Sequence, residues 1–473
     1  MSSPAGNPEP LAQARPDSAG GYPSFWLDRE PPGPSRPALS GREEADVCIV
    51  GGGFTGLWAA YELKRAAPEL RVTVLEARHV GFGASGRNGG WAVGIISGSP
   101  AAWRRRGGTQ APRRMLEAIQ ATVAEIGQAV EREAIDCDWH HGGSLAVAQN
   151  ATQRARLEAG VSEQRSWAGE ACALQLLSAD ELQARINVAG ASAGMFNPHC
   201  ARIQPAKLVR GLAAAAERAG VVVHESSPVV DVVPRLVRTA AGHVSARQVI
   251  VACEGYTANL PRRHRWLLPL NSSMIVTEPL SPEIWQHLGW EGAETLLDGS
   301  HAYTYSQRTA DGRIAIGGRG VPYRFGSKTD REGPVPSETV EELRHRLAAM
   351  FPVLGDVGVT RAWHGVLGVS RDWCPWVSYD PASGLGFAGG YAGDGVAASN
   401  LAGRTLRDLL LERDTPLSTL PWVNTPPRAW EPEPFRYAGA RGIYALYRKA
   451  DRQEELSDRP ARLAAVADLI AGR

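Results

Sequence analysis

The sequence predicts a protein of two packed domains: an α/β domain with a parallel sheet, and an α+β domain with an antiparallel sheet. At 473 residues, the chain is longer than one ordinary hydrophobic core requires. Apolar runs alternate with helical patterns near both ends of the chain, as they do in βαβ units. From about 264 to 326, apolar and polar residues instead alternate one by one, which is typical of antiparallel strands.

Composition excludes several classes of protein. Hydrophobic residues make up 43% and charged residues 21%, which indicates a folded globular chain. The formal net charge of +1 gives no electrostatic reason to expect nucleic acid or an anionic membrane as partner. No apolar run approaches the roughly 18 residues of a membrane span. The Ser-, Pro- and Gly-rich residues 1–22 predict a flexible leader rather than a signal peptide.

The six cysteines are scattered and form no CxxC pair. They are typical of reduced thiols in an intracellular protein, so we expect a cytoplasmic location, no disulfide framework and no metal site.

The first βαβ unit begins with the apolar strand 45–50 and continues through a helix at 55–67 to a second strand at 71–76. The turn between the first strand and the helix reads GxGxxG, with Gly51, Gly53 and Gly56 in the glycine positions. Gly51 permits a tight turn, Gly53 lets the backbone approach a pyrophosphate, and Gly56 lets helix and strand pack closely. Glu76 ends the second strand, where it can accept hydrogen bonds from ribose hydroxyls. This context predicts a dinucleotide site of the Rossmann type.

A second Gly-rich segment, 81–90, favours FAD over NAD as the dinucleotide. Two phosphate-facing loops suit an extended cofactor that is buried along its length, and Arg87 could balance pyrophosphate charge. The alternative is a loop with an ordinary surface arginine.

A third Gly-rich segment, 389–396, directly precedes a helix at 396–411. A helix N-terminus at the edge of a flavin would stabilise the negative charge that develops on reduction. Asp394 could serve this site or could simply cap the helix, and the two interpretations are compatible.

The remaining patterns place further elements along the chain. Helices are expected at 112–133, 152–186, 205–220 and 337–350, and strands at 143–148, 221–225, 248–253, 273–277, 302–306 and 384–388. Asp311-Gly312 is a hairpin signal. The expected division is a leader and arm at 1–40; a discontinuous nucleotide domain at 41–135, 196–262 and 355–421; a substrate domain at 136–195 and 263–354; and a C-terminal extension at 422–473.

Several motifs together resemble the D-amino-acid-oxidase-like superfamily of FAD oxidoreductases, in its branch of gamma-glutamylputrescine oxidase and related amine oxidases. They are YPSFWLD from Tyr22, VGGGFTGLWAAYEL, VGFGASGRNGGW, TADGRI, GVLGVSRDW and GYAGDGVAASNLAGRTL. The resemblance implies a glutathione-reductase-type FAD domain beside an antiparallel substrate domain. It also implies non-covalent FAD and hydride transfer from the α-carbon of an uncharged small-molecule amine to flavin N5. The imine then hydrolyses, and molecular oxygen reoxidises the flavin to give hydrogen peroxide.

The resemblance also assigns residues to the FAD site. These are Gly51, Gly53, Phe54, Thr55, Gly56, Glu76, Ser85, Arg87, Asn88, Gly89, Gly90, Val229, Gly390, Asp394, Gly395 and Val396. One departure concerns the acceptor: sarcosine-oxidase-type relatives carry a lysine in the strand that follows Asp311-Gly312. The strand here, 313–317, contains none, which leaves open a dehydrogenase with another acceptor.

Substrate-side candidates come from residues near these motifs. Trp91 follows the second loop, Tyr303 and Tyr305 share a face of one expected strand, and His364 and Arg371 flank GVLG. An aromatic wall with one cation would suit an aminated carboxylate or phosphonate. His199 is more readily an ordinary loop histidine.

Two other functions compete with amine oxidation. A flavin monooxygenase begins with the same fingerprint but would accept NAD(P)H. A flavin-binding subunit or assembly factor would hold FAD without turnover. The sequence does not predict the oligomeric state or the particular amine.

Overall fold

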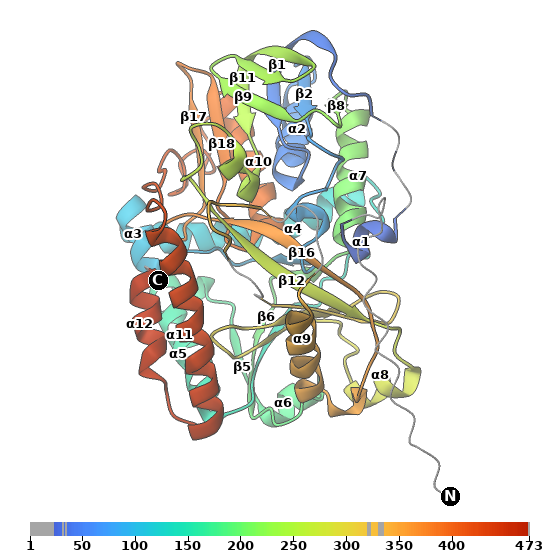
Figure 1. Ribbon diagram of the computed structural model, residues 1–473, viewed down its shortest axis with the longest axis vertical. Helices are drawn as coiled ribbons and strands as arrows, with labels where there is room; N and C mark the ends of the chain where they lie inside the picture. The colour runs from blue at the N-terminus through green and yellow to red at the C-terminus, as the bar shows by residue number, and fades with distance from the viewer. Residues whose placement is uncertain (1–22, 31–32, 34–35, 319–322, 330–334, 472–473) are drawn as a thin grey trace, which may run out of the picture.

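The structure, a computed structural model, describes residues 23–30, 33, 36–318, 323–329 and 335–471. Two eight-stranded sheets lie one above the other in the orientation of Figure 1. The leader expected at 1–22 lies outside the described residues. None of the described helices is both long enough and apolar enough to cross a membrane.

The upper sheet contains the strands of the predicted nucleotide domain. Its order is β17 (Trp376–Asp380), β18 (Leu385–Gly389), β11 (Gly242–Val251), β1 (Gly41–Val50), β2 (Val72–Leu75) and β8 (Val222–His224). The strands from β18 to β8 run parallel, and β17 adds an antiparallel edge. The strands β9 (Val229–Val233) and β10 (Leu236–Thr239) form a hairpin that pairs with β11.

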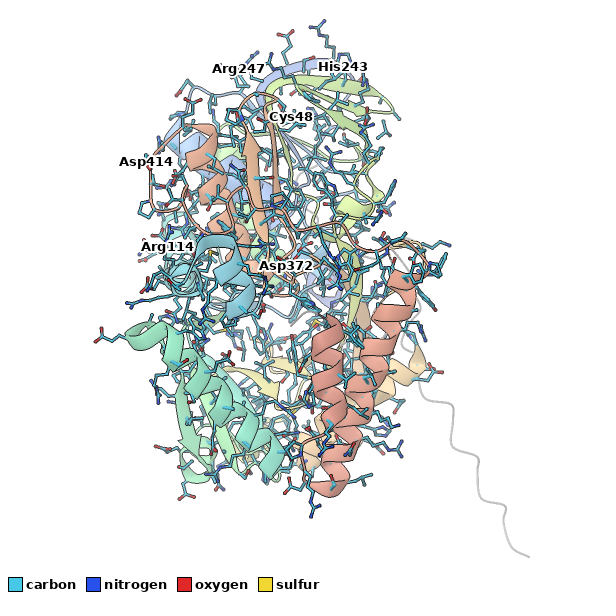
Figure 2. All side chains as sticks on the ribbon, turned by 90° about the vertical axis from the view of Figure 1, so that its left-hand side faces the viewer. Cys48, Arg114, His243, Arg247, Asp372 and Asp414 are labelled. Carbon is cyan, nitrogen blue, oxygen red and sulfur yellow. The ribbon has the colours of Figure 1, made fainter. Side chains whose placement is uncertain are left out.

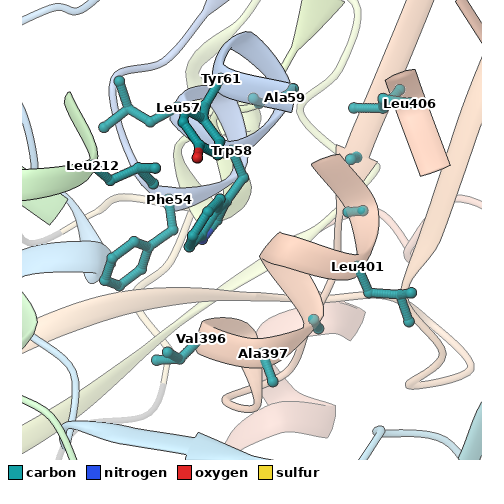
Figure 3. Close-up of a cluster of buried hydrophobic side chains, with 14 of the residues drawn as sticks. Phe54, Leu57, Trp58, Ala59, Tyr61, Leu212, Val396, Ala397, Leu401 and Leu406 are labelled. Atoms are coloured by element: carbon teal, nitrogen blue, oxygen red, sulfur yellow. The ribbon is translucent and has the colours of Figure 1, made fainter. Parts of the chain in front are cut away.

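Both faces of this sheet are covered, which is why its central strands are apolar without interruption. Four helices pack on one face: α2 (Phe54–Ala66), α4 (Ala111–Arg132), α7 (Pro205–Arg218) and α10 (Gly395–Leu410). Val47 and Ile49 of β1 face this helical layer, whereas Cys48 and Val50 join a cluster on the other face. Figure 3 shows the apolar side chains through which α2 and α10 meet, and Cys48 is labelled in Figure 2.

The lower sheet forms the second domain. Its order is β16 (Val359–Val369), β12 (Leu268–Thr277), β15 (Ile314–Gly318), β14 (Tyr305–Arg308), β13 (Thr295–Asp298), β4 (Ser144–Ala148), β6 (Ala193–Asn197) and β5 (Gln175–Ser178). All pairings are antiparallel except that of β13 with β4. The helices α6 (Ala179–Gln183), α8 (Pro282–Leu288) and α9 (Ser337–Met350) contribute to its apolar core.

Three local expectations differ from the structure. The segment 355–370 was expected in the nucleotide domain, but β16 pairs with β12 of the lower sheet, and its Val359 and Ala362 pack against the core of that domain. The expected helix 152–186 is instead α5 (Ala151–Ala168), strand β5 and α6, since Gly169 adopts a positive φ of 59° and ends α5. Tyr303 precedes β14, so it does not share a strand with Tyr305.

The C-terminal extension consists of two helices, α11 (Phe435–Ser457) and α12 (Arg462–Ala471), that lie beside the lower domain (Figure 1). Asp451 of α11 accepts hydrogen bonds from the backbone N–H groups of His301 (2.7 Å) and Ala302 (2.9 Å). Glu454 accepts from the His301 ring at 3.1 Å and pairs with Arg156. The ligand-type atoms of His301, Asp451 and Glu454 lie within 4.8 Å of one another, but these contacts already engage all three side chains.

Replacing Asp451 by Ala should destabilise the folded protein. The change removes the acceptor for two N–H groups, each of which costs on the order of 1 kcal/mol when left unpaired, so we expect a loss of about 2 kcal/mol. Chemical denaturation followed by circular dichroism measures it. Asp414→Ala, at the exposed residue labelled in Figure 2, is the matched control. Equal stability of the two variants would contradict the role given to Asp451.

Candidate active site

A cavity of about 420 Å³ lies where the carboxyl ends of β1, β2 and β11 meet the starts of α2 and α10. Parallel sheets bind ligands at this edge, since loops from several strands converge there. The residues predicted for the cofactor that line it are Gly51, Gly53, Phe54, Thr55, Glu76, Ser85, Asn88, Val229, Gly395 and Val396. The other predicted cofactor residues are not among those that line it: Gly56, Arg87, Gly89, Gly90, Gly390 and Asp394.

The first glycine turn cannot accept side chains. Gly51 has φ of 115°, and a Cβ there would lie 2.6 Å from the carbonyl oxygen of Ala252. A Cβ at Gly56 would lie 2.0 Å from the backbone oxygen of Gly51. Helix α2 therefore begins in close contact with β1, and its N-terminus lies at the cavity, where a helix dipole favours an anion; the N–H of Phe54 donates to the Ser85 hydroxyl at 2.8 Å.

Glu76 follows β2 and holds this turn. One carboxylate oxygen accepts the N–H of Gly52 at 2.8 Å, and the other accepts the N–H of Arg78 at 2.9 Å. Burial raises the pKa of Glu76, against the lowering effect of these two N–H groups. The side chain lines the cavity, which suits the predicted contact with ribose.

The second half of the second loop, 86–89, is held by hydrogen bonds to its carbonyl groups. The N-terminal helix α1 (Phe25–Asp28) packs against it: Ser24 donates to the carbonyl of Gly86 at 2.6 Å, and the Trp26 indole donates to that of Asn88 at 2.9 Å. Gln307 of β14 donates to the carbonyl of Gly89 at 2.6 Å. The loop is therefore held by the N-terminal arm and by the lower sheet.

Arg87 does not take the position expected for a charge that balances pyrophosphate. The side chain is 2% exposed; its Nε donates to the carbonyl of Phe82 at 2.7 Å, and Nη1 donates to that of His364 at 3.4 Å. The guanidinium lies 4.4 Å from the centre of the Phe82 ring. Arg87 thus connects the second loop to β16 and is not part of the cavity wall.

Asn88, Gly89 and Gly90 complete the loop. The Asn88 amide donates to the carbonyls of Ala84 and Ser85 and accepts the N–H of Gly90 at 2.8 Å. Gly90 has φ of 73°, a conformation that favours glycine. The predicted contacts of Gly89 and Gly90 with FAD remain predictions.

The third loop, between β18 and α10, is organised by Tyr391. Its hydroxyl bonds to that of Thr55 at 3.1 Å, its N–H donates to Glu254 at 2.9 Å, and its carbonyl accepts from Ser97 at 3.1 Å. Gly390 before it has φ of 81°.

Asp394 occupies the N-cap position of α10 but makes no side-chain cap; it accepts a hydrogen bond from Ser97 at 2.6 Å. The capping interpretation is therefore wrong for its side chain.

These three loops fit an FAD molecule, since glycine is required at the start of α2, a carboxylate ends β2, and a second helix begins at the far end of the cavity. Residues 46–409 match the family described as FAD dependent oxidoreductase. The chain belongs to this family. FAD is accordingly its cofactor, and the predicted resemblance, fold class and enzyme class are confirmed.

Relatives of known name agree with this assignment. The chain is 32% identical to gamma-glutamylputrescine oxidoreductase of Escherichia coli, over 86% of this chain and 93% of that protein. It is 29% identical to the probable oxidoreductase OrdL of Haemophilus influenzae, over 85% and 91%. The crystal structure of glycine oxidase from Geobacillus kaustophilus aligns with a TM-score of 0.66 at 23% identity, over 79% and 96%. At that identity, the last comparison shows the fold alone.

The proposed substrate residues are only partly brought together. Trp91, at the start of β3 (Trp91–Val93), meets Tyr305 edge to face, with ring centroids 6.3 Å apart. The Tyr305 hydroxyl bonds to that of Ser272 at 2.8 Å. His364 is buried in β16 and does not line the cavity. His199 belongs to the turn between β6 and β7 (Cys200–Arg202), and its pKa is lowered by burial and by His141.

Arg371 is directed away from the cavity. It pairs with Glu431 of the C-terminal extension at 3.0 Å and lies 5.2 Å from the centre of the Trp430 ring. Although burial alone would raise the pKa of Glu431, its N–H contacts and Arg371 hold it below the usual value. Arg371 therefore anchors the extension, which its sequence position beside GVLG did not indicate.

Four residues that support the site were missed by sequence reasoning: Ser24, Trp26, Gln307 and Tyr391. Ser24 and Trp26 belong to a motif that carried the resemblance, but nothing in the motif indicates its partner. Gln307 and Tyr391 act through contacts across the two domains or across the cavity, and no local pattern reports these.

Gly56→Ala should weaken FAD binding at least about tenfold, because a displacement of α2 disturbs the N–H groups that face the cofactor. The flavin-to-protein ratio and titration of the FAD-free chain measure it. Gly439→Ala is the control, since a Cβ there meets no atom within 4 Å. Wild-type affinity in Gly56→Ala would show that α2 need not contact β1 so closely.

Arg371→Met should change kcat/KM for an amine substrate less than about twofold, and should lower stability by at most about 1 kcal/mol, as expected for a partly exposed ion pair. Glu431→Gln breaks the same pair from the other side and should behave alike. A KM raised tenfold or more in Arg371→Met alone would instead assign Arg371 to the substrate.

Proposed function

We propose that this enzyme oxidises the C–N bond of a small amine or amino acid to an imine, which hydrolyses, with molecular oxygen as the second acceptor. Bound FAD supplies the two-electron acceptor for the hydride that leaves the amine-bearing carbon. The similarity to gamma-glutamylputrescine oxidoreductase over nearly the whole chain supports the substrate class.

The observation that carries the proposal is the position of Tyr305. Its ring lies 2.8 Å from where a Cβ of Gly89 would be and 2.4 Å from that of Gly317, so it fits only because both residues are glycine. Tyr305 and Trp91 therefore form an aromatic corner directly on the second FAD loop. Such a corner can hold the carbon chain of an amine and exclude water.

The polar part of this corner is the hydroxyl pair of Tyr305 and Ser272. These hydroxyls can accept from, or donate to, an uncharged amine and so fix the direction of its α-carbon hydrogen. An amine that arrives without a proton needs no catalytic base. Tyr305, Trp91 and Ser272 are thus positioning groups in the proposed reaction.

One observation favours a dehydrogenase as the second candidate. Strand β15 follows the Asp311-Gly312 turn and consists of Ile314, Ala315, Ile316, Gly317 and Gly318. The strand expected at 313–317 contains no lysine, whereas sarcosine-oxidase-type relatives carry there a lysine that helps oxygen react. An acceptor other than oxygen would need no such charge.

Anaerobic mixing of the full-length holoenzyme with a panel of amines tests the proposal. Gamma-glutamylputrescine, glycine, sarcosine, dimethylglycine and L-proline sample the substrates named by relatives and structural neighbours. We expect at least one amine to bleach the flavin absorbance, and admitted oxygen to restore it with formation of peroxide. Bleaching without rapid reoxidation would favour the dehydrogenase. Reduction by NADPH but by no amine would overturn the proposal.

A further inference from the structure

Glu254 is a carboxyl group in the wall of the FAD cavity that none of the three glycine loops explains. It follows β11 and begins the short helix η3 (Glu254–Asn259), and it lines the cavity. Its φ of 47° lies in the left-handed region, which costs energy for a residue with a β-carbon. The fold therefore holds this side chain in a conformation that directs it toward the cofactor site.

The two oxygens of Glu254 have different surroundings. Oε1 accepts the N–H of Tyr391 at 2.9 Å and so holds the third loop. Oε2 is buried and makes no well-aligned hydrogen bond to any described residue, although the backbone N–H groups of Gly368 and Gly390 lie close enough to lower the pKa of the carboxyl. It lies against β16, where a Cβ at Gly368 would be 2.1 Å from it. A carboxylate with one buried, unpaired oxygen is costly, and a protonated carboxyl is less so.

No cation among the described residues lowers the pKa of Glu254, although Arg78 also lines the cavity. On its own segment lie Cys253 and Tyr256, the third loop contributes Tyr391, and Glu76 lies in the same cavity wall. Burial raises the pKa of Glu254 to about 8, against the lowering effect of the N–H groups of Tyr391, Gly368 and Gly390.

The nearest charged groups do not change this conclusion. Cys253 is a neutral thiol whose pKa burial raises to about 12, and the pKa of Tyr391 is raised mainly by burial. Arg263 acts on Cys253 and is itself partly buried beside Arg262. On the β16 side, Val366 and Leu367 line the cavity and carry no charge.

We propose that Glu254 is a proton-carrying part of the FAD site, and that the chain binds FAD tightly only while this carboxyl is protonated. The cofactor brings a doubly negative pyrophosphate into the same low-dielectric cavity. An ionised Glu254 would repel it, whereas a neutral one would not. The inference concerns cofactor binding alone and holds whichever amine is the substrate.

The sign of the pH dependence follows from the two ionisation states. Below the pKa of Glu254 in the FAD-free chain, the carboxyl is already neutral and affinity is at its maximum. As pH rises through that value, FAD must either bind beside a carboxylate or draw in a proton. The dissociation constant of the wild-type chain should therefore increase at least about tenfold between pH 6.5 and 9.5.

Glu254→Gln tests the proposal, since glutamine reproduces the shape and acceptor of the neutral acid. FAD titration of the full-length chain, followed by quenching of flavin fluorescence, should give wild-type affinity within about twofold at pH 6.5 and no comparable loss at pH 9.5. Glu294→Gln is the matched control: Glu294 is also buried with one unpaired oxygen, but it lies in the lower domain beside Arg185. This control should keep the wild-type pH dependence.

A measurement on the wild-type chain does not depend on how the variant folds. Calorimetric titration with FAD at pH 9, in two buffers of different protonation enthalpy, should show proton uptake on binding. A wild-type dissociation constant that stays level from pH 6.5 to 9.5 without proton uptake would overturn the proposal. So would a Glu254→Gln variant that loses affinity as the wild type does, or one that binds FAD much more tightly at pH 6.5.

Discussion

The buried hydrogen bond between the hydroxyls of Thr55 and Tyr391 joins two segments 336 residues apart in the sequence. Thr55 belongs to the first turn of α2, and Tyr391 to the loop that begins α10. Both helices start at the edge of the upper sheet and pack against each other through an apolar interface (Figure 3). Because the cavity lies between these two starts, their relative position determines whether one extended cofactor can meet both. This hydrogen bond therefore joins the first and last segments of the discontinuous nucleotide domain at the cavity.

Much of the fold was predictable because its constraints are local. A strand covered on both faces must be apolar throughout, and β1 meets that requirement from Val47 to Val50. A helix that begins against a strand needs glycine where the backbones touch, as at Gly56. Strand β16 was misplaced because its sequence, VTRAWHGVLGV, shows neither the continuous apolar run of the upper sheet nor a strict alternation. Its membership is decided by pairing with β12, which is distant in the sequence.

The site residues likewise fall into those that local sequence predicts and those that it does not. The glycine loops were recognisable because their requirement lies in the backbone. The roles of charged side chains were not, since a charge acts through whichever partner the fold supplies. Arg87 donates hydrogen bonds to carbonyl groups, and Arg371 forms a salt bridge with Glu431. Arg106 forms a salt bridge with Asp372, which is labelled near the middle of Figure 2. In each case the partner is tens to hundreds of residues away or belongs to the backbone.

These pairings determine how the protein meets the negative charge of FAD. With Arg87 and Arg371 engaged elsewhere, Arg78 is the only Arg or Lys among the described residues of the cavity wall, and its guanidinium lies 5.2 Å from the centre of the Phe82 ring. We therefore expect the pyrophosphate to be bound mainly by the N–H groups and the dipole of α2, a weaker and less specific attraction than a guanidinium pair. A site that relies on dipoles tolerates a nearby carboxylate poorly. The protonation state of a carboxyl in the wall should therefore matter more here than it would beside a bound arginine.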